Sequence, residues 1–287
     1  MALNSNMKKL SIVFTLFFAL VSFANAQHKA QKSQKLKNNN KTNHKTDTLA
    51  YTLEILNQES KGCNDNCSFV QISYPLFKNR PKLNKIMVNE TLNYLGNDYV
   101  DYYKLNNIDT AFKHLADDYL QGTEPDIING DSTEVDSAEL SQNITYLDII
   151  ARPYNEDSHV IVIEFDEDMS GGAHPNSEYT YINWDKKTDR LIKLEDIIRD
   201  WDKFAVIAEK IFWKDAKSNG NSAEGYNFPD GKFELNGNFQ IMPEGIVFYY
   251  NAYEIAPYAY GPTRLLIPYT KIKSLLLPHT VIAQYIK

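Results

Sequence analysis

Hydrophobic and polar residues alternate along much of the chain, which is the period-two pattern of a β-strand with one buried face. Turn-forming residues separate the alternating segments. We predict strands at Leu49–Leu56, Ser68–Tyr74, Ile144–Pro153, His159–Glu167, Ser177–Trp184, Asn238–Met242, Gly245–Tyr250 and Thr263–Pro268.

Three other segments repeat their apolar residues every three to four positions, as one face of a helix does. The first begins near Pro81 and should end by Gly96, and the second follows Asp109 and should end at Gly122. The third covers about Trp201–Lys217, and its predicted buried stripe is Phe204, Ile207, Ala208, Ile211 and Phe212. Shorter helical turns are expected at Leu194–Ile198 and Tyr269–Leu275, and an acidic loop at Thr123–Ser141.

The order of these elements predicts the fold class. No βαβ rhythm, internal repeat or glycine-rich nucleotide loop is visible. We therefore expect an α+β fold with a mainly antiparallel sheet and two or three packed helices.

The first 47 residues differ in composition from the rest. Lys8 and Lys9 precede the apolar run Leu10–Phe23, and Ala24-Asn25-Ala26 is a small-x-small cleavage site. Residues 1–26 are therefore predicted to be a cleaved signal peptide, since a mainly apolar stretch of 14 residues is too short for an uncleaved anchor. Residues 27–47 read as a flexible basic linker, or else as an arm that contacts anionic envelope polymers. The expected location is outside the cytoplasm, periplasmic or secreted, with no stable membrane span.

The distribution of charged residues also changes near residue 46. The formal net charge is −7, but residues 1–46 hold eight Lys and no acid, so residues 47–287 carry a net charge of −15. This acidity argues against nucleic acid as a partner, because phosphate binding needs a basic face. If the partner is a protein, a basic one fits best. No motif for a cofactor or a metal is present, and none is expected.

Cys63 and Cys67 are the only cysteines. In an oxidising compartment such a close pair is expected to form a disulfide that pins the loop between the first two strands. A redox role would favour Cys-x-x-Cys beside a helix, and a zinc site would need a second pair of ligands.

Two segments of the sequence carry more specific information than the overall composition does. One is Gly171-Gly172-Ala173-His174-Pro175-Asn176, followed by the aromatic strand 179–185, and the other is Phe248–Pro262. Together they resemble the extracellular domain of RsiV-type anti-sigma factors, and a similar module accompanies PdaC-type peptidoglycan deacetylases. A preceding module in that family has a strand ending in Tyr-Pro, as in Ile72-Ser73-Tyr74-Pro75. The resemblance implies a PdaC-like module at 48–150 and an RsiV-like module at 151–287, packed as one unit.

The resemblance implies a function in binding. The RsiV ectodomain is a receptor that binds lysozyme and blocks its active site. Only nine residues precede the apolar run, so we expect no cytoplasmic anti-sigma domain, and no two histidines have the His-x-x-x-His spacing of the deacetylases. We therefore expect an exported, non-enzymatic binding or sensor module that recognises a lysozyme-like protein or a cell-wall glycan.

The candidate binding residues lie in the same two segments: Tyr253, Glu254, Pro257, Tyr258, Tyr260, Pro262, Gly171, Gly172 and His174. Tyrosine offers a large contact area at low entropic cost, and Pro257 and Pro262 stiffen the loop that displays it. The competing interpretation makes these aromatic residues structural core. His174 is expected to fix a turn.

Two alternatives stay open. In the first, His174 and an acidic residue form the catalytic pair of an enzyme acting on cell-wall glycans. In the second, the protein is a purely structural component of the envelope. Glu164, Asp166, Glu167 and Asp168 are expected to form a solvated strand face rather than a calcium loop, since Ser177 occupies the twelfth position.

Overall fold

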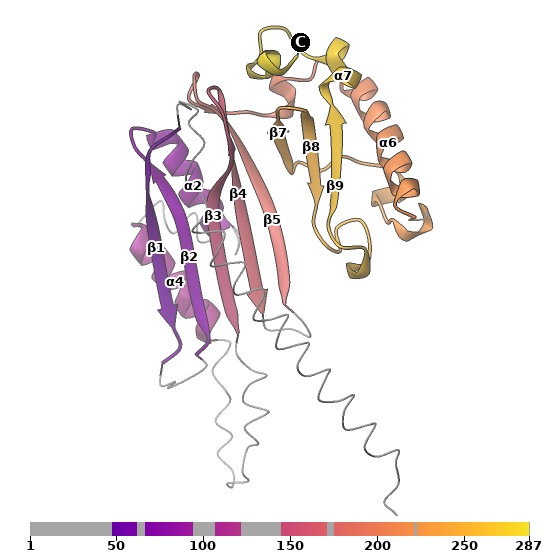
Figure 1. The fold of residues 1–287 in the computed structure, drawn as a ribbon. Helices are drawn as coiled ribbons and strands as arrows, with labels where there is room; N and C mark the ends of the chain where they lie inside the picture. Colours follow the sequence, from indigo (N-terminus) through magenta and orange to yellow (C-terminus); the bar gives the residue numbers. More distant parts are fainter. Residues whose placement is uncertain are drawn as a thin grey trace, which may run out of the picture. The chain divides into compact units, whose positions relative to one another are not determined.

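The computed structural model describes residues 48–61, 67–93, 107–121, 145–170, 175–220 and 223–286, all in the unit of the chain that spans 47–287. These residues form an α+β fold with two sheets (Figure 1). The larger sheet has six strands in sequence order: β1 (Tyr51–Glu59), β2 (Phe69–Phe77), β3 (Tyr146–Glu156), β4 (Val160–Ser170), β5 (Asn176–Asp185) and β6 (Arg190–Leu191). The predicted signal peptide and linker lie outside the described residues.

β1 and β2 form the predicted hairpin around the cysteine loop. Their antiparallel ladder is extended by a hydrogen bond from the Ser60 amide to the Ser68 carbonyl, 2.9 Å long. Cys63 lies outside the described residues, so its pairing with Cys67 stays a prediction.

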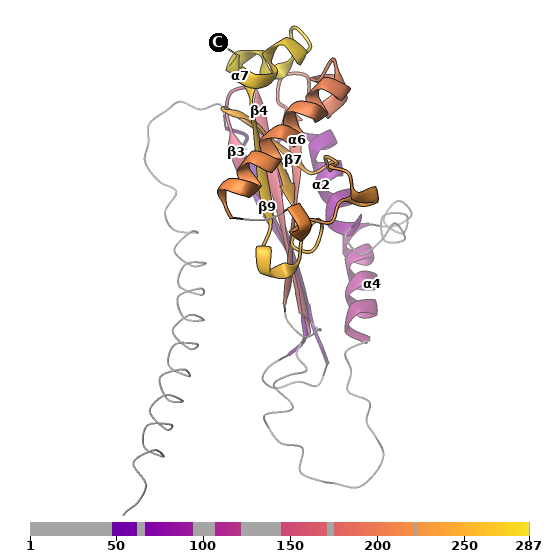
Figure 2. The ribbon, with the colours of Figure 1, turned by 90° about the vertical axis from the view of Figure 1, so that its right-hand side faces the viewer.

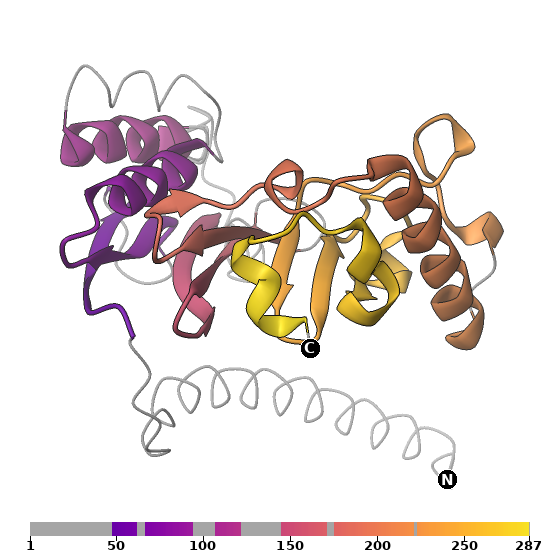
Figure 3. The same ribbon diagram turned by 90° about the horizontal axis from the view of Figure 1, so that it is seen from above.

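β2 and β3 pair in parallel, which the sequence did not lead us to expect. Parallel neighbours need a long crossover, and here it contains α2 (Pro81–Asn93) and α4 (Ile108–Gln121). Both helices cover one face of the sheet (Figure 3). All other strand pairs are antiparallel, so the predicted mainly antiparallel sheet is confirmed.

The smaller sheet consists of β7 (Phe239–Met242), β8 (Gly245–Tyr250) and β9 (Thr263–Pro268). One face packs against α6 (Trp201–Ser218), and α7 (Tyr269–Ile272) follows β9 directly (Figure 2). The side chain of Asp200 caps α6 by accepting a hydrogen bond from the Lys203 amide.

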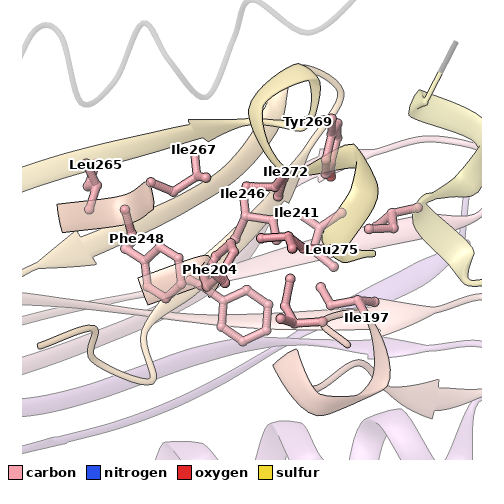
Figure 4. Packing of buried hydrophobic residues seen from close by; sticks show 14 of the residues in the cluster. Ile197, Phe204, Ile241, Ile246, Phe248, Leu265, Ile267, Tyr269, Ile272 and Leu275 are labelled. Carbon is pink, nitrogen blue, oxygen red and sulfur yellow. The ribbon is translucent and has the colours of Figure 1, made fainter. Parts of the chain in front are cut away.

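The core of this smaller layer is built from α6 and β8. The rings of Phe204 and Phe248 lie 6.1 Å apart, and both side chains are fully buried (Figure 4). The buried stripe of α6 is Phe204, Ala208, Phe212 and Ala216. The predicted Ile207 and Ile211 are only partly buried at the edge of this core.

Asparagine side chains join the two sheets. The Asn183 amide nitrogen donates to the Phe239 carbonyl, and its oxygen accepts from the Ile241 amide, both at 2.7 Å. Asn183 is 1% exposed, so one β5 side chain satisfies two buried backbone groups of β7.

Residue 150, the predicted boundary between modules, lies within β3. Among the described residues, no helix is long and apolar enough to cross a membrane.

Candidate functional site

The face of the larger sheet that points away from α2 and α4 carries a row of polar side chains. Strand register sets Arg152 of β3 opposite Glu164 of β4, which is in turn opposite Tyr181 of β5. Asp166 lies opposite Tyr179 in the next row of the same face. Residues i and i+2 share a face, so these five side chains come together by strand alternation.

Arg152 joins the two carboxylates of this row. Its Nη2 atom lies 2.6 Å from Glu164 Oε1 and 3.0 Å from Asp166 Oδ2. Burial opposes ionisation of Arg152, but the two carboxylates hold its pKa above the ordinary value. The Tyr181 hydroxyl donates to Glu164 Oε2 at 3.0 Å. The expected solvated strand face is therefore wrong, because Glu164 and Asp166 are 5% and 8% exposed.

Glu167 lies on the opposite face of β4 and is also buried, at 3% exposure. It sits directly across from Glu178 of β5. Burial, together with the charges of Glu178, Glu90 and Asp166, raises the pKa of Glu167 to about 8. At neutral pH this carboxyl group is therefore largely protonated.

The loop between β8 and β9 is attached to the edge of β5 by Asn251. The Asn251 side chain accepts from the Tyr179 amide at 2.8 Å and donates to the Tyr179 carbonyl at 3.1 Å. Asn238 donates to the same carbonyl at 2.7 Å. These bonds replace a missing strand neighbour and fix the loop beside the polar row.

Glu254 stabilises the turn at the start of this loop. Its carboxylate accepts from the Asn251 amide at 2.8 Å and from the Asn236 side chain at 2.6 Å. Tyr253, inside the turn, has φ +68°, a left-handed conformation that costs a tyrosine energy. Strain of this kind often marks functional positions.

Tyr253 and Tyr258 form an exposed aromatic pair. Their ring centroids lie 5.4 Å apart, and the residues are 57% and 49% exposed. Tyr260 is anchored differently, because its ring packs edge-on against Tyr226 at 5.7 Å and lies over Gly225. Pro257 precedes the short helical turn Tyr258–Tyr260, which is closed by a bond from the Tyr260 amide to the Pro257 carbonyl.

A cavity of about 460 Å³ separates this loop from β5. That volume is in the range of small-ligand sites. Its walls come from β5, the end of β8 and the loop: Ser177, Tyr179, Tyr249, Ala252, Tyr258, Ala259, Tyr260, Gly261 and Pro262. We call this space the tyrosine cavity.

A second cavity of about 320 Å³ is lined in part by Tyr181, Ile182 and Asn183 of β5. Ile86 and Glu90 of α2 and residues 191–195 contribute to its walls. Partial burial raises the pKa of Glu90. The residues that line this second cavity do not form an arrangement that indicates a reaction.

The structure places the predicted site residues unevenly. Tyr258, Tyr260 and Pro262 line the tyrosine cavity, and Tyr253, Glu254 and Pro257 belong to the same loop. Gly171, Gly172 and His174 lie outside the described residues. Within the described residues, no three His, Cys, Asp or Glu side chains are grouped to hold a metal ion.

Sequence reasoning missed the β5 wall of the cavity. Ser177 and Tyr179 were assigned to a strand without a role, although the alternation of Ser177, Tyr179 and Tyr181 places them on one face. Asn251 was also missed, because a side chain that replaces a strand neighbour leaves no local pattern.

Comparison with known proteins finds a family that is similar to part of the second half of the chain. Residues 186–270 match the model of the family described as "Protein of unknown function (DUF3298)". This segment is similar to that family over 85 residues. It contains the smaller sheet, α6 and the loop that borders the tyrosine cavity.

Two solved structures of DUF3298 family proteins share the fold. The one from Bacteroides fragilis has a TM-score of 0.61 and 21% identity, covering 84% of this chain and 99% of its own. The one from Pseudomonas aeruginosa has a TM-score of 0.57 and 18% identity, covering 81% and 96%. The similarity in fold to these two structures therefore extends beyond residues 186–270 and covers most of the chain.

Curated proteins match a smaller part of the chain than the two solved structures do. The immunogenic proteins MPB64 of Mycobacterium bovis and MPT64 of Mycobacterium tuberculosis are each 27% identical over 111 residues. The match takes in 37% of this chain and 47% of theirs. This chain thus spans about half the length of the curated relatives it matches.

Proposed function

We propose that this protein is an exported, non-enzymatic binding protein of the cell envelope, and that it recognises its ligand at the tyrosine cavity. The observation that carries the proposal is the Tyr253–Tyr258 pair. Tyr253 keeps a large exposed ring in a strained left-handed conformation beside a cavity of about 460 Å³. Stability alone would favour glycine at such a position.

The proposed ligand is a basic protein of the lysozyme type. Three features support this choice: the resemblance to RsiV-type receptors, the net charge of −15 in residues 47–287, and the acidic side chains next to the cavity. Charge complementarity favours a cationic partner, and exposed tyrosines are frequent hot spots at interfaces.

The direct test mixes the mature protein, residues 27–287, with lysozyme. We expect a complex with micromolar or tighter affinity by calorimetry and a loss of muramidase activity at stoichiometric ratios. No binding at micromolar concentrations would rule out the lysozyme version of the proposal.

A cell-wall glycan is the second candidate, because the cavity walls contain four tyrosines on which sugar rings can stack. Titration with soluble peptidoglycan fragments in place of lysozyme distinguishes the two ligands.

No reaction is proposed for the site. The alternative of a catalytic pair requires His174, which lies outside the described residues, and an acidic partner that is not already engaged. Glu164 and Asp166 are already bound to Arg152.

Replacing Tyr253 with glycine separates stability from binding. Tyr253→Gly is expected to leave the free energy of unfolding unchanged or raise it by up to about 1 kcal/mol, because glycine adopts φ +68° without strain. The same variant should weaken lysozyme binding at least fivefold, because the exposed ring is gone. Urea unfolding and calorimetry measure the two effects.

Asp230→Gly is the matched control, since Asp230 is exposed and has φ +53°. It should bind lysozyme as the wild type does. A Tyr253→Gly protein that loses stability and keeps full affinity would show that the ring serves the fold and not the ligand.

A further inference from the structure

One oxygen of the polar row has no hydrogen-bond partner among the described residues. Asp166 accepts from Arg152 through Oδ2, but its Oδ1 atom is buried and unpaired. The residue is 8% exposed. Buried carboxylate oxygens are nearly always paired, and an unpaired one costs about 1–3 kcal/mol. Such an atom therefore favours a donor that binds from outside.

The charge around Asp166 favours a cationic donor. Glu164 and Asp166 share the single guanidinium of Arg152, so the three groups together carry one net negative charge. The side chain of Arg152 is 42% exposed, and the cluster therefore faces solvent on one side. A neutral donor would leave this charge unbalanced.

Three tyrosine rings lie beside the carboxylates of Glu164 and Asp166 or contact the rings that do. Tyr179 lies opposite Asp166, and Tyr181 opposite Glu164. Tyr249 contacts both rings edge-on, with centroids 5.6 Å away in each case. The face of an aromatic ring attracts ammonium and guanidinium groups, and a neighbouring carboxylate adds to that attraction.

The cluster adjoins the tyrosine cavity. Tyr179 and Tyr249 line the cavity, and Tyr179 lies opposite Asp166, so a ligand in the cavity contacts a direct neighbour of the cluster. Oδ1 is covered in the unbound protein, and Tyr179 is its cross-strand neighbour. We expect a cation to reach this oxygen when the partly buried Tyr179 ring changes its rotamer.

We propose that Asp166, Glu164 and the rings of Tyr179, Tyr181 and Tyr249 form a subsite for one lysine or arginine side chain of a basic protein partner. This inference rests on the proposed function, because the lysine or arginine is taken to belong to the partner that binds at the tyrosine cavity. The subsite gives the interface one buried charge-assisted contact next to the exposed tyrosine pair.

The test uses the mature protein and two probes. Lysozyme titration should show that Asp166→Asn lowers the affinity about tenfold or more, since one charge-assisted hydrogen bond is lost. Asp215→Asn, on the exposed face of α6, is the matched control and should keep the wild-type affinity. An unchanged affinity in a folded Asp166→Asn protein would overturn the subsite.

The second probe does not depend on lysozyme or on any variant. Methylguanidinium at millimolar concentration should shift the amide NMR signals of Tyr179 and Tyr181 in the wild type, and guanidinium-free sodium chloride at equal ionic strength should not.

Shifts with methylguanidinium but no lysozyme complex would support the subsite and reject the lysozyme partner. A lysozyme complex without these shifts would support the proposed function and reject the subsite. If glucosamine oligomers bind through Asp166 while lysozyme does not, the assignment to a protein ligand is wrong.

Discussion

Asn183→Ala is expected to lower the free energy of unfolding by about 2–5 kcal/mol. The substitution removes both 2.7 Å hydrogen bonds and leaves the Phe239 carbonyl and the Ile241 amide unpaired. Phe239 and Ile241 are 7% and 0% exposed, so water does not replace the lost partner without rearrangement. Each buried, unsatisfied backbone group costs about 1–3 kcal/mol. Urea unfolding of the mature protein measures the change.

Two further variants identify the cause of that loss. Asn183→Asp keeps the acceptor for the Ile241 amide but sets a carboxylate against the Phe239 carbonyl, and should destabilise the protein by a similar amount. Asn57→Ala removes an exposed asparagine on β1 and should change stability by less than about 0.5 kcal/mol. If Asn183→Ala costs no more than Asn57→Ala, the asparagine bonds do not hold the two sheets together.

The second large effect concerns pH. The pKa of Glu167 is raised to about 8 in the folded protein, from an ordinary value near 4.5. The folded state therefore holds an extra proton between these two values, and the unfolded state does not. The contribution of Glu167 to stability is fully present below about pH 4.5 and is lost as the pH rises through 8.

Glu167→Gln cannot ionise and should lose this pH dependence. We expect it to match the wild type within about 1 kcal/mol at pH 4.5 and to be more stable by roughly 2–5 kcal/mol at pH 9. Urea unfolding at pH 4.5, 6, 7.5 and 9 gives the comparison. Glu59→Gln, an exposed position on β1, is the control and should follow the wild type at each pH. Parallel curves for Glu167→Gln and the wild type would mean that Glu167 ionises normally.

The sequence predicted most of the fold because burial of one sheet face produces a local signal. The alternation in β3 follows burial residue by residue, and the stripe of α6 follows its helical period. β4 and β8 are buried on both faces, and their apolar runs indicate strands without alternation. The parallel pairing of β2 and β3 could not be predicted from a local pattern, because it depends on where a long crossover returns to the sheet. Pairing partners far apart in sequence leave no local pattern.

The candidate site shows the same division. The proline and glycine residues around Tyr258 and Tyr260 predicted a loop that displays one of them, with structural core as the competing interpretation, and both are exposed. Burial of Glu164 and Asp166 could not be predicted, because it depends on pairing with Arg152 of the neighbouring strand. The attachment of the loop to Tyr179 through Asn251 likewise needed the structure.

The most direct test of the account is the affinity of the Tyr258→Ala protein for lysozyme. Tyr51→Ala is the matched control, because Tyr51 is 48% exposed and Tyr258 49%, but Tyr51 lies on β1. If the tyrosine cavity is the recognition site, Tyr258→Ala should lower the affinity about thirtyfold, as a hot-spot residue would, and Tyr51→Ala should leave it unchanged. Equal affinity of the wild type and both variants, or no complex with any of the three, would contradict the account.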